Sequence, residues 1–215
     1  MDIQANQTLL MIGDSVTDCG RARPIGEGLG DACGNGYPAL VRALLDSCYP
    51  ERNIRVINMG TSGDTVRDLG ARWQADVLDL RPDWITIMIG INDVWRQFDS
   101  PTTPHLAVPP GEYEATLSEL VAAAKALPAG VVVMTPYFME PLRADKMRAR
   151  MDEYGAAAKR VAAAHNARLV DTQALFDRLF EDCYTARISW DRVHPNLAGH
   201  MLLARALLKA LNFDR

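Results

Sequence analysis

The sequence has no long hydrophobic run, and its most apolar stretch, Trp84–Ile91, is only as long as a β-strand. A helix that spans a bilayer needs about 18 or more consecutive apolar residues. The first 13 residues also have no basic leader and only a short apolar run, which is not the pattern of a secretory signal. We therefore expect a cytoplasmic protein that has no membrane as a partner.

Clusters of basic residues and paired cysteines are also missing. The chain has 23 Lys and Arg against 27 Asp and Glu, so an acidic surface without a basic block makes nucleic acid a poor partner. The four cysteines show neither CxxC pairing nor the spacing of zinc ligands, which predicts four free thiols. Only Cys19 has basic neighbours, Arg21 and Arg23, as a reactive thiol would require.

What the chain does have is enough apolar sequence for one hydrophobic core. Its 215 residues are 48% hydrophobic and 23% charged, which excludes a disordered chain and predicts a single domain over residues 1–215.

Strand-like and helix-like segments alternate from one end to the other. Five short apolar segments predict strands buried on both faces: Thr8–Gly13, Arg55–Met59, Trp84–Gly90, Val131–Thr135 and Arg168–Asp171. Segments with helical periodicity lie between and after them: Tyr37–Cys48, Thr65–Leu80, Glu112–Leu127, Asp145–His165 and Pro195–Leu211, with Pro195 in the first turn of its helix. This alternation predicts an α/β fold, a three-layer α/β/α sandwich around a five-stranded parallel sheet. Such sheets bind ligands beyond the carboxyl ends of their strands.

Two long loops interrupt the alternation. Residues 20–36 are rich in glycine, and residues 93–111 contain Pro101, Pro104, Pro109 and Pro110. Long loops in compact domains are often functional, although a surface insertion or a contact in a homo-oligomer explains the proline-rich loop equally well.

The first predicted strand runs directly into Gly13-Asp14-Ser15. Asp14 and Ser15 are both good helix caps, so this segment is either a capped strand–helix junction or a site where the Ser15 hydroxyl is free to attack.

The second and third strands end in segments that could stabilise a negative charge. Gly60 lies in a turn that can present backbone N–H groups, with Asp64 as cap of the next helix, although Ser62 is conceivable as a nucleophile. Asn92 either closes a turn or offers its side-chain amide. If Gly60 and Asn92 both face Ser15, they form an oxyanion hole.

A serine nucleophile needs a base, and His194 is the best placed of the four histidines. Asp191 precedes it by three residues, so within a turn its carboxylate reaches one imidazole nitrogen while the other faces Ser15. A polar turn with a helix cap is the alternative for this segment alone. His105, His165 and His200 lie in a proline-rich loop or in helices.

The sequence supports metal binding and nucleotide binding less well than a serine nucleophile. His194 and His200 do not share a helix face, no run of acidic residues has the spacing of a cation-binding loop, and no phosphate-binding glycine motif is present.

Four sequence blocks, in order, resemble those of the SGNH hydrolases, the GDSL-like esterases and lipases: Gly13-Asp14-Ser15, Gly60, Gly90-Ile91-Asn92-Asp93 and Asp191-Arg192-Val193-His194-Pro195. Further segments, such as 17–24, 89–97 and 190–195, look like those of the family's bacterial acetylxylan esterases. The resemblance implies a flavodoxin-like SGNH fold and a serine esterase that deacetylates xylo-oligosaccharides. It implies Ser15 as nucleophile, His194 as base, Asp191 as its partner, Gly60 and Asn92 as oxyanion donors, and no metal or organic cofactor.

The expected partner is therefore a small acetylated sugar or oligosaccharide. Trp190 and Trp95 offer wide aromatic faces for a sugar ring, unless they only pack loops against the core, and Asp14 completes the predicted substrate-binding set. The alternatives are a broader short-chain esterase or thioesterase, and a non-catalytic carbohydrate-binding protein with the same fold.

Overall fold

A parallel sheet of five strands forms the centre of the molecule in the computed structural model, which describes residues 1–99 and 102–213. The strand order is β2-β1-β3-β4-β5, and every neighbouring pair is parallel. The strands are β1 (Thr8–Gly13), β2 (Arg55–Asn58), β3 (Trp84–Met88), β4 (Gly130–Met134) and β5 (Arg168–Val170). The five predicted strands are confirmed, with ends that differ by at most two residues.

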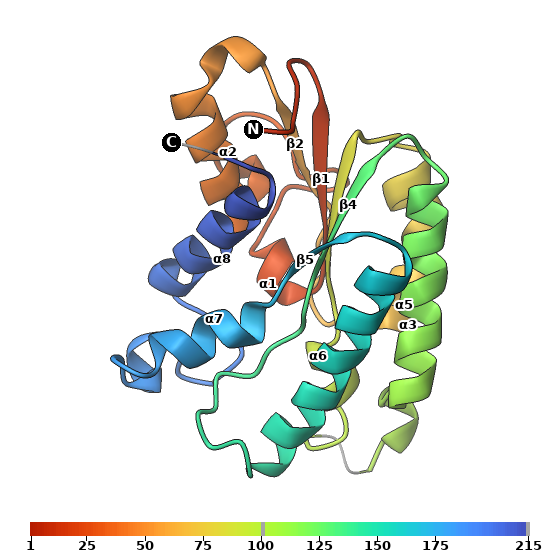
Figure 1. Ribbon diagram of the computed structural model, residues 1–215, viewed down its shortest axis with the longest axis vertical. Coiled ribbons are helices and arrows are strands. Elements are labelled where there is room, and N and C mark those ends of the chain that lie inside the picture. Colours follow the sequence, from red (N-terminus) through yellow and green to blue (C-terminus); the bar gives the residue numbers. More distant parts are fainter. Residues whose placement is uncertain (100–101, 214–215) are drawn as a thin grey trace.

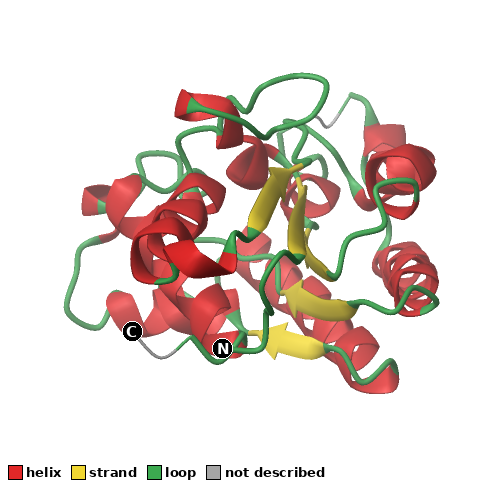
Figure 2. Cartoon of the chain, turned by 90° about the horizontal axis from the view of Figure 1, so that it is seen from above, coloured by secondary structure: helices red, strands yellow, loops and turns green. Residues whose placement is uncertain are grey.

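Helices cover both faces of this sheet (Figure 1 and Figure 2). One layer contains α2 (Tyr37–Cys48), α7 (Thr172–Leu179) and α8 (Leu197–Ala210), and the other contains α3 (Val66–Trp73), α5 (Pro110–Lys125) and α6 (Lys146–Ala164). Alternate residues of β1 serve the two layers: Leu9 and Met11 pack in the core under α2 and α8, whereas Leu10 and Ile12 pack under α3, α5 and α6. The predicted three-layer sandwich is confirmed.

Shorter helical segments lie in the connections. Two are the short α-helices α1 (Ser15–Asp18) and α4 (Ile91–Trp95), and a π-helical turn, η3 (Gln74–Leu78), prolongs α3. The remaining ones are 3₁₀ turns: η1 (Gly30–Cys33), η2 (Pro50–Arg52), η4 (Pro104–Leu106) and η5 (Thr185–Arg187). None of the helices in the described ranges is both long and apolar enough to cross a membrane.

The structure corrects several details of the sequence prediction. Helix α7 was not expected, although Asp171 caps it and apolar residues recur along it at helical spacing. Pro195 is not in the first turn of α8, because Asn196 is the N-cap and the helix begins at Leu197. The expected loop over residues 93–111 begins inside α4, and its Pro101 lies outside the described residues.

The strand order determines where the loops meet. The connection after β1 and the connection after β3 leave the sheet on opposite faces. With this strand order a crevice forms between the carboxyl ends of the two strands, and α/β proteins of this topology bind ligands there. Ser15 follows the end of β1 by two residues, and Asn92 follows that of β3 by four. Both therefore lie at the edge of the sheet where a ligand is expected.

A buried arginine joins α6 to α7. The Arg148 side chain is 2% exposed; its Nε donates to Asp152 Oδ1 over 2.9 Å, and Nη2 donates to Asp177 Oδ2 over 2.7 Å. Arg150 on the same helix instead pairs with Glu153 at the surface.

We expect Arg148→Met to lower the free energy of unfolding by about 2–4 kcal/mol, because it leaves Asp177 without its buried partner. Arg150→Met, the matched control, should change it by less than about 0.5 kcal/mol. Urea unfolding of both variants measures the difference, and equal effects would contradict this assignment.

Candidate active site

Three predicted residues form a continuous chain of hydrogen bonds. The Ser15 hydroxyl lies 2.8 Å from His194 Nε2, and His194 Nδ1 lies 2.6 Å from Asp191 Oδ2. The other carboxylate oxygen, Oδ1, accepts hydrogen bonds from the Ser189 hydroxyl and from the backbone N–H groups of Val193 and His194. The carboxylate is therefore held by the same turn that carries the imidazole.

These contacts determine the state of each group. Burial alone would raise the pKa of Asp191, but the hydrogen bonds from His194, Val193 and Ser189 lower it overall, so the group is an anion at neutral pH. Because a carboxylate anion can only accept hydrogen bonds, Nδ1 of His194 carries the hydrogen and donates it to Asp191. Nε2 of the neutral ring is then left to accept the proton of the Ser15 hydroxyl. The arrangement suits proton removal from Ser15.

The local fold presents Ser15 at the end of β1. Asp14 is the N-cap of α1, and its carboxylate accepts the Val16 N–H over 3.0 Å, while the Ser15 N–H donates no hydrogen bond within the described chain. Gly13 is required just before this turn, because a Cβ there would lie 2.2 Å from the carbonyl oxygen of Met88 on β3.

Asp14 is 2% exposed, and its observed contact is the helix cap. Burial raises its pKa to about 7, and the nearby carboxylate of Asp93 acts in the same direction. A role in binding substrate stays a prediction, although little of its surface is accessible.

The loop after β2 does not present Gly60 as predicted. The Gly60 N–H donates to Asn58 Oδ1 over 2.9 Å, so this N–H is already used inside the protein. Gly63, three residues later, is a better donor: its N–H has no partner among the described residues, its φ of +89° favours glycine, and a Cβ built there would meet no atom within 4 Å. Gly63 was not predicted from the sequence, although a second glycine in the same turn was a signal for it.

Asn92 lies in the third loop, on the short helix α4. Its Nδ2 donates to the carbonyl oxygen of Asp64 over 2.9 Å, and its Oδ1 accepts from Arg96 over 3.2 Å. Because an amide nitrogen carries two hydrogens, the side chain is fixed in orientation and retains one N–H for a ligand. Asp64 itself pairs with Arg72 and is not the helix cap, since Thr65 and Asp68 form a capping box for α3.

A buried carboxylate joins the first loop to the second. Asp18, the last residue of α1, accepts at Oδ2 the N–H of Ser62 over 2.9 Å and its hydroxyl over 2.8 Å, and pairs with Arg23 over 2.7 Å. Its other oxygen, Oδ1, is buried without a hydrogen-bond partner among the described residues. Asp18 therefore fixes the residue before Gly63 relative to Ser15. The same contacts exclude Ser62 as the nucleophile, because its hydroxyl points to a carboxylate that has no histidine beside it.

The two tryptophans lie in different surroundings. The ring of Trp95 is 6.1 Å from that of His194 and borders the triad. Trp190 is 88% exposed and lines a separate cavity of about 620 Å³ together with Tyr184 and Arg192. Trp95 is thus brought to the triad, whereas the indole of Trp190 faces away from the core.

His200, His165 and Cys19 are explained without catalysis. His200 is buried, accepts the Tyr37 N–H at Nδ1 and lies 3.5 Å from Cys19 Sγ; burial lowers its pKa to about 4. Burial and the carboxylate of Asp18 raise the pKa of Cys19 to about 12, so its basic neighbours in the sequence do not make it a reactive thiol. His165 pairs with Ser118. None of the four cysteines forms a disulfide, and no group of three or more metal-ligating side chains occurs in residues 1–99 and 102–213.

Comparisons with known proteins agree with this geometry. The sequence profile of the GDSL-like Lipase/Acylhydrolase family matches residues 11–202. An acetylxylan esterase of Geobacillus stearothermophilus is 53% identical over 214 residues, covering 100% of this chain and 98% of the relative. The crystal structure of that organism's acetylxylan esterase Axe2 superposes with a TM-score of 0.97 at 53% identity, with the same coverage of 100% and 98%. LAE5, an α/β hydrolase enzyme from the metagenome of Lake Arreo, has a TM-score of 0.96 at 52% identity and covers 99% of this chain and 98% of its own.

Solved variants of Axe2 bear directly on the triad. Three of them, S15A, D191A and H194A, are described as catalytic mutants, and this chain has Ser, Asp and His at the same numbers. The hydrogen-bonded residues of this structure therefore coincide with residues that are catalytic in a full-length relative.

We expect Asp18→Ala to lower kcat about 10- to 100-fold, with KM changed less than about 3-fold, because the Ser62–Gly63 segment loses its anchor and an oxyanion donor is misplaced. Asp18→Asn should recover most of the activity, since its side-chain carbonyl still accepts from Ser62. Asp31→Ala, at an exposed position of the loop that follows α1, is the control. A change in KM alone would argue against this positioning role.

We also expect Asp14→Asn to flatten the dependence of stability on pH. The folded protein holds a proton on Asp14 up to about pH 7, whereas an unfolded aspartate releases it near pH 4. Between these values the folded state binds more protons, so the free energy of unfolding falls as pH rises through this window and levels off above it. Asparagine keeps the acceptor for Val16 but does not titrate. Urea unfolding at pH 4.5 and 7.5 tests this, and equal slopes for the variant and the wild type would contradict it.

Proposed function

The chain belongs to the GDSL-like lipase/acylhydrolase family, and from this premise we propose that it is a serine esterase that removes acetyl groups from xylo-oligosaccharides. The observation that carries the proposal is the agreement between its Ser15–His194–Asp191 hydrogen bonds and the catalytic mutants of Axe2, an acetylxylan esterase. The name acetyl-xylooligosaccharide esterase, given to Axe2 in two of its variant structures, supports a short sugar chain as the substrate.

The reaction begins when Ser15 Oγ attacks the carbonyl carbon of the acetyl ester. His194 Nε2 takes the hydroxyl proton, and the imidazolium that forms is stabilised by the Asp191 carboxylate. The carbonyl oxygen becomes an oxyanion, for which we assign the free N–H groups of Ser15 and Gly63 and the remaining N–H of Asn92.

Collapse of this intermediate breaks the bond to the sugar oxygen. His194 gives its proton to that oxygen, so the sugar leaves as an alcohol and the acetyl group stays on Ser15. Water then attacks the acetyl-enzyme, with His194 as base again, and acetate leaves as Ser15 regains its proton. His194 accepts and returns the proton in each of these reaction steps.

The rival functions give different results in one assay. A broader short-chain esterase hydrolyses longer acyl esters or thioesters as fast as acetyl esters, and a carbohydrate-binding protein hydrolyses none. The intact triad argues against the binding protein, because sugar binding does not require its hydrogen bonds.

We expect the wild type to release acetate from acetylated xylo-oligosaccharides and to prefer acetyl over butanoyl esters. Ser15→Ala should lower kcat by at least about 10³-fold, because it removes the nucleophile but leaves the fold unchanged. Ser62→Ala, which removes a different hydroxyl from the same edge of the sheet, should retain far more activity. Undiminished acetate release by Ser15→Ala would refute the mechanism.

Two other expectations stay predictions: a cytoplasmic location and self-association of the chain. Fractionation of the source cells tests the first, and light scattering of the purified protein tests the second.

A further inference from the structure

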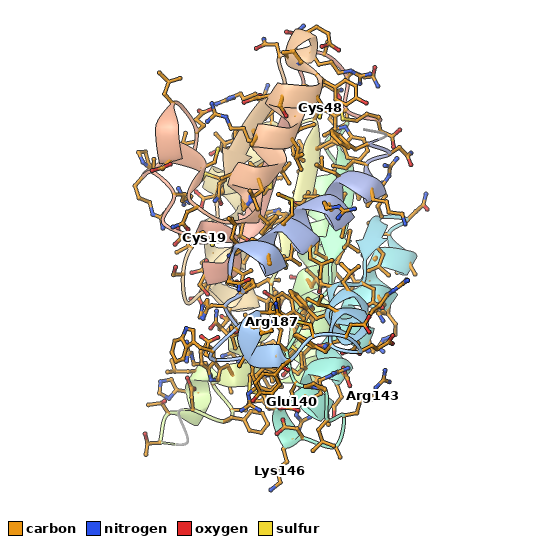
Figure 3. The ribbon with its side chains drawn as sticks, turned by 90° about the vertical axis from the view of Figure 1, so that its left-hand side faces the viewer. Cys19, Cys48, Glu140, Arg143, Lys146 and Arg187 are labelled. Carbon is orange, nitrogen blue, oxygen red and sulfur yellow. The ribbon has the colours of Figure 1, made fainter. Side chains whose placement is uncertain are left out.

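A cleft of about 310 Å³ lies beside the triad, and no step of the mechanism above uses it. Its lining includes Trp95, Phe98, Phe138, Lys146 and Arg192. Figure 3 shows Lys146 and Glu140 at the same end of the molecule, opposite Cys48. The volume is at the low end of the range for small-molecule sites, about 300–1,000 Å³.

The cleft adjoins His194 through two of its walls. The ring of Trp95 is 6.1 Å from the imidazole, and Arg192 lies two residues before His194 in the turn that begins at Asp191. During ester cleavage His194 protonates the departing alcohol, so the alcohol lies on the His194 side of the reacting carbon. A cleft on that side receives the alcohol part of the ester, not the acetyl group.

The walls are rigid enough to bind a ring in one orientation. Arg192 has a φ of +65°, an uncommon conformation that the surrounding contacts maintain. Its backbone oxygen accepts the Met139 N–H over 2.8 Å, its guanidinium pairs with Glu140 over 2.6 Å, and the same group lies 5.0 Å from the centre of the Phe138 ring. Such a preformed wall lowers the entropy cost of binding.

The chemistry of the lining suits a neutral polyol with apolar ring faces. Phe98 is 41% exposed and Trp95 is half-buried, so aromatic surface is available to the C–H face of a sugar. Lys146 is exposed and has no hydrogen bond or ion pair among the described residues, which leaves its ammonium free to donate to hydroxyls. The carboxylate of Asp99 and the guanidinium of Arg192 are already neutralised, by Arg96 and Glu140 respectively.

We infer that this cleft is the sugar-binding subsite for the leaving alcohol, with Trp95 and Phe98 against the ring of the acetylated residue and Lys146 on its hydroxyls. The inference rests on the proposed function for the identity of the sugar. It assigns the alcohol to this cleft and not to the larger cavity at Trp190, because Trp95, whose ring pairs with that of His194, lines this cleft and is not among the described residues that line the larger cavity.

The decisive variant is Phe98→Ala, because Phe98 is partly exposed and its loss should leave the fold unchanged. We expect KM for acetylated xylobiose to rise about 3- to 10-fold with little change in kcat. The kcat/KM for ethyl acetate, whose alcohol is too small to reach Phe98, should stay within about 2-fold. Leu142→Ala removes an exposed apolar side chain from outside the cleft and is the matched control.

A binding measurement separates this inference from the proposed function. Calorimetric titration of xylobiose into Ser15→Ala and into Ser15→Ala/Phe98→Ala needs no turnover, and the second protein should bind about 3- to 10-fold more weakly. Equal affinities, or no binding to either protein, would overturn the subsite. If the wild type hydrolyses ethyl acetate but releases no acetate from the sugar, the proposed function fails while the titration still decides the subsite.

Discussion

The hydrogen bond between Ser15 and His194 joins two residues that are 179 positions apart, and the function of the molecule depends on that contact. Neither residue has unusual local surroundings: one follows a strand, and the other lies in a turn before a helix. What brings them together is the parallel sheet, because all five strands end at one edge and the connections after β1 and β3 leave that edge on opposite faces. The core that packs on both faces of the sheet therefore holds the loops that place the Ser15 hydroxyl 2.8 Å from His194 Nε2.

The edge where these loops meet is rich in buried polar groups, and their hydrogen bonds make it rigid. Asp18 joins α1 to Ser62, Asn58 accepts the Gly60 N–H and donates to the carbonyl oxygen of Thr17, and Asn92 reaches Asp64. Desolvation of such groups costs free energy unless each finds a partner. Among the described residues, Ser15, Gly63 and Asn92 each keep an N–H without a partner, and we assign these donors to the negative charge that develops during ester hydrolysis. Apart from Asp18 Oδ1, which is buried without a partner among the described residues, these polar groups either bond within the loops or are donors assigned to the substrate.

Most of the fold and the three triad residues could be predicted, because local patterns carry them. Buried parallel strands are continuous apolar runs, and the three-residue spacing of Asp191 and His194 allows only a few turn geometries. Other details were inaccessible for a physical reason. Gly60 and Gly63 look equivalent in the sequence, and only the contact of Gly60 with Asn58 distinguishes them. The basic neighbours of Cys19 suggested a reactive thiol, but burial decides its pKa, and burial depends on how α8 packs. Aspartate is a residue type that often caps helices, but Asp64 pairs with Arg72 and Thr65 caps α3.

Sequence alone determined the α/β class, the five strands, and the identity of the nucleophile, the base and its carboxylate partner. The class and the strands follow from hydrophobic periodicity, which acts over a few neighbouring positions, whereas the triad residues follow from four sequence blocks that together resemble one family. Tertiary structure alone decided which backbone N–H groups remain free, which carboxylates are buried, and where a cleft opens beside Trp95. Each of these depends on contacts between segments far apart in the chain. Hydrogen-bond satisfaction and desolvation are properties of such contacts, not of the order of residues.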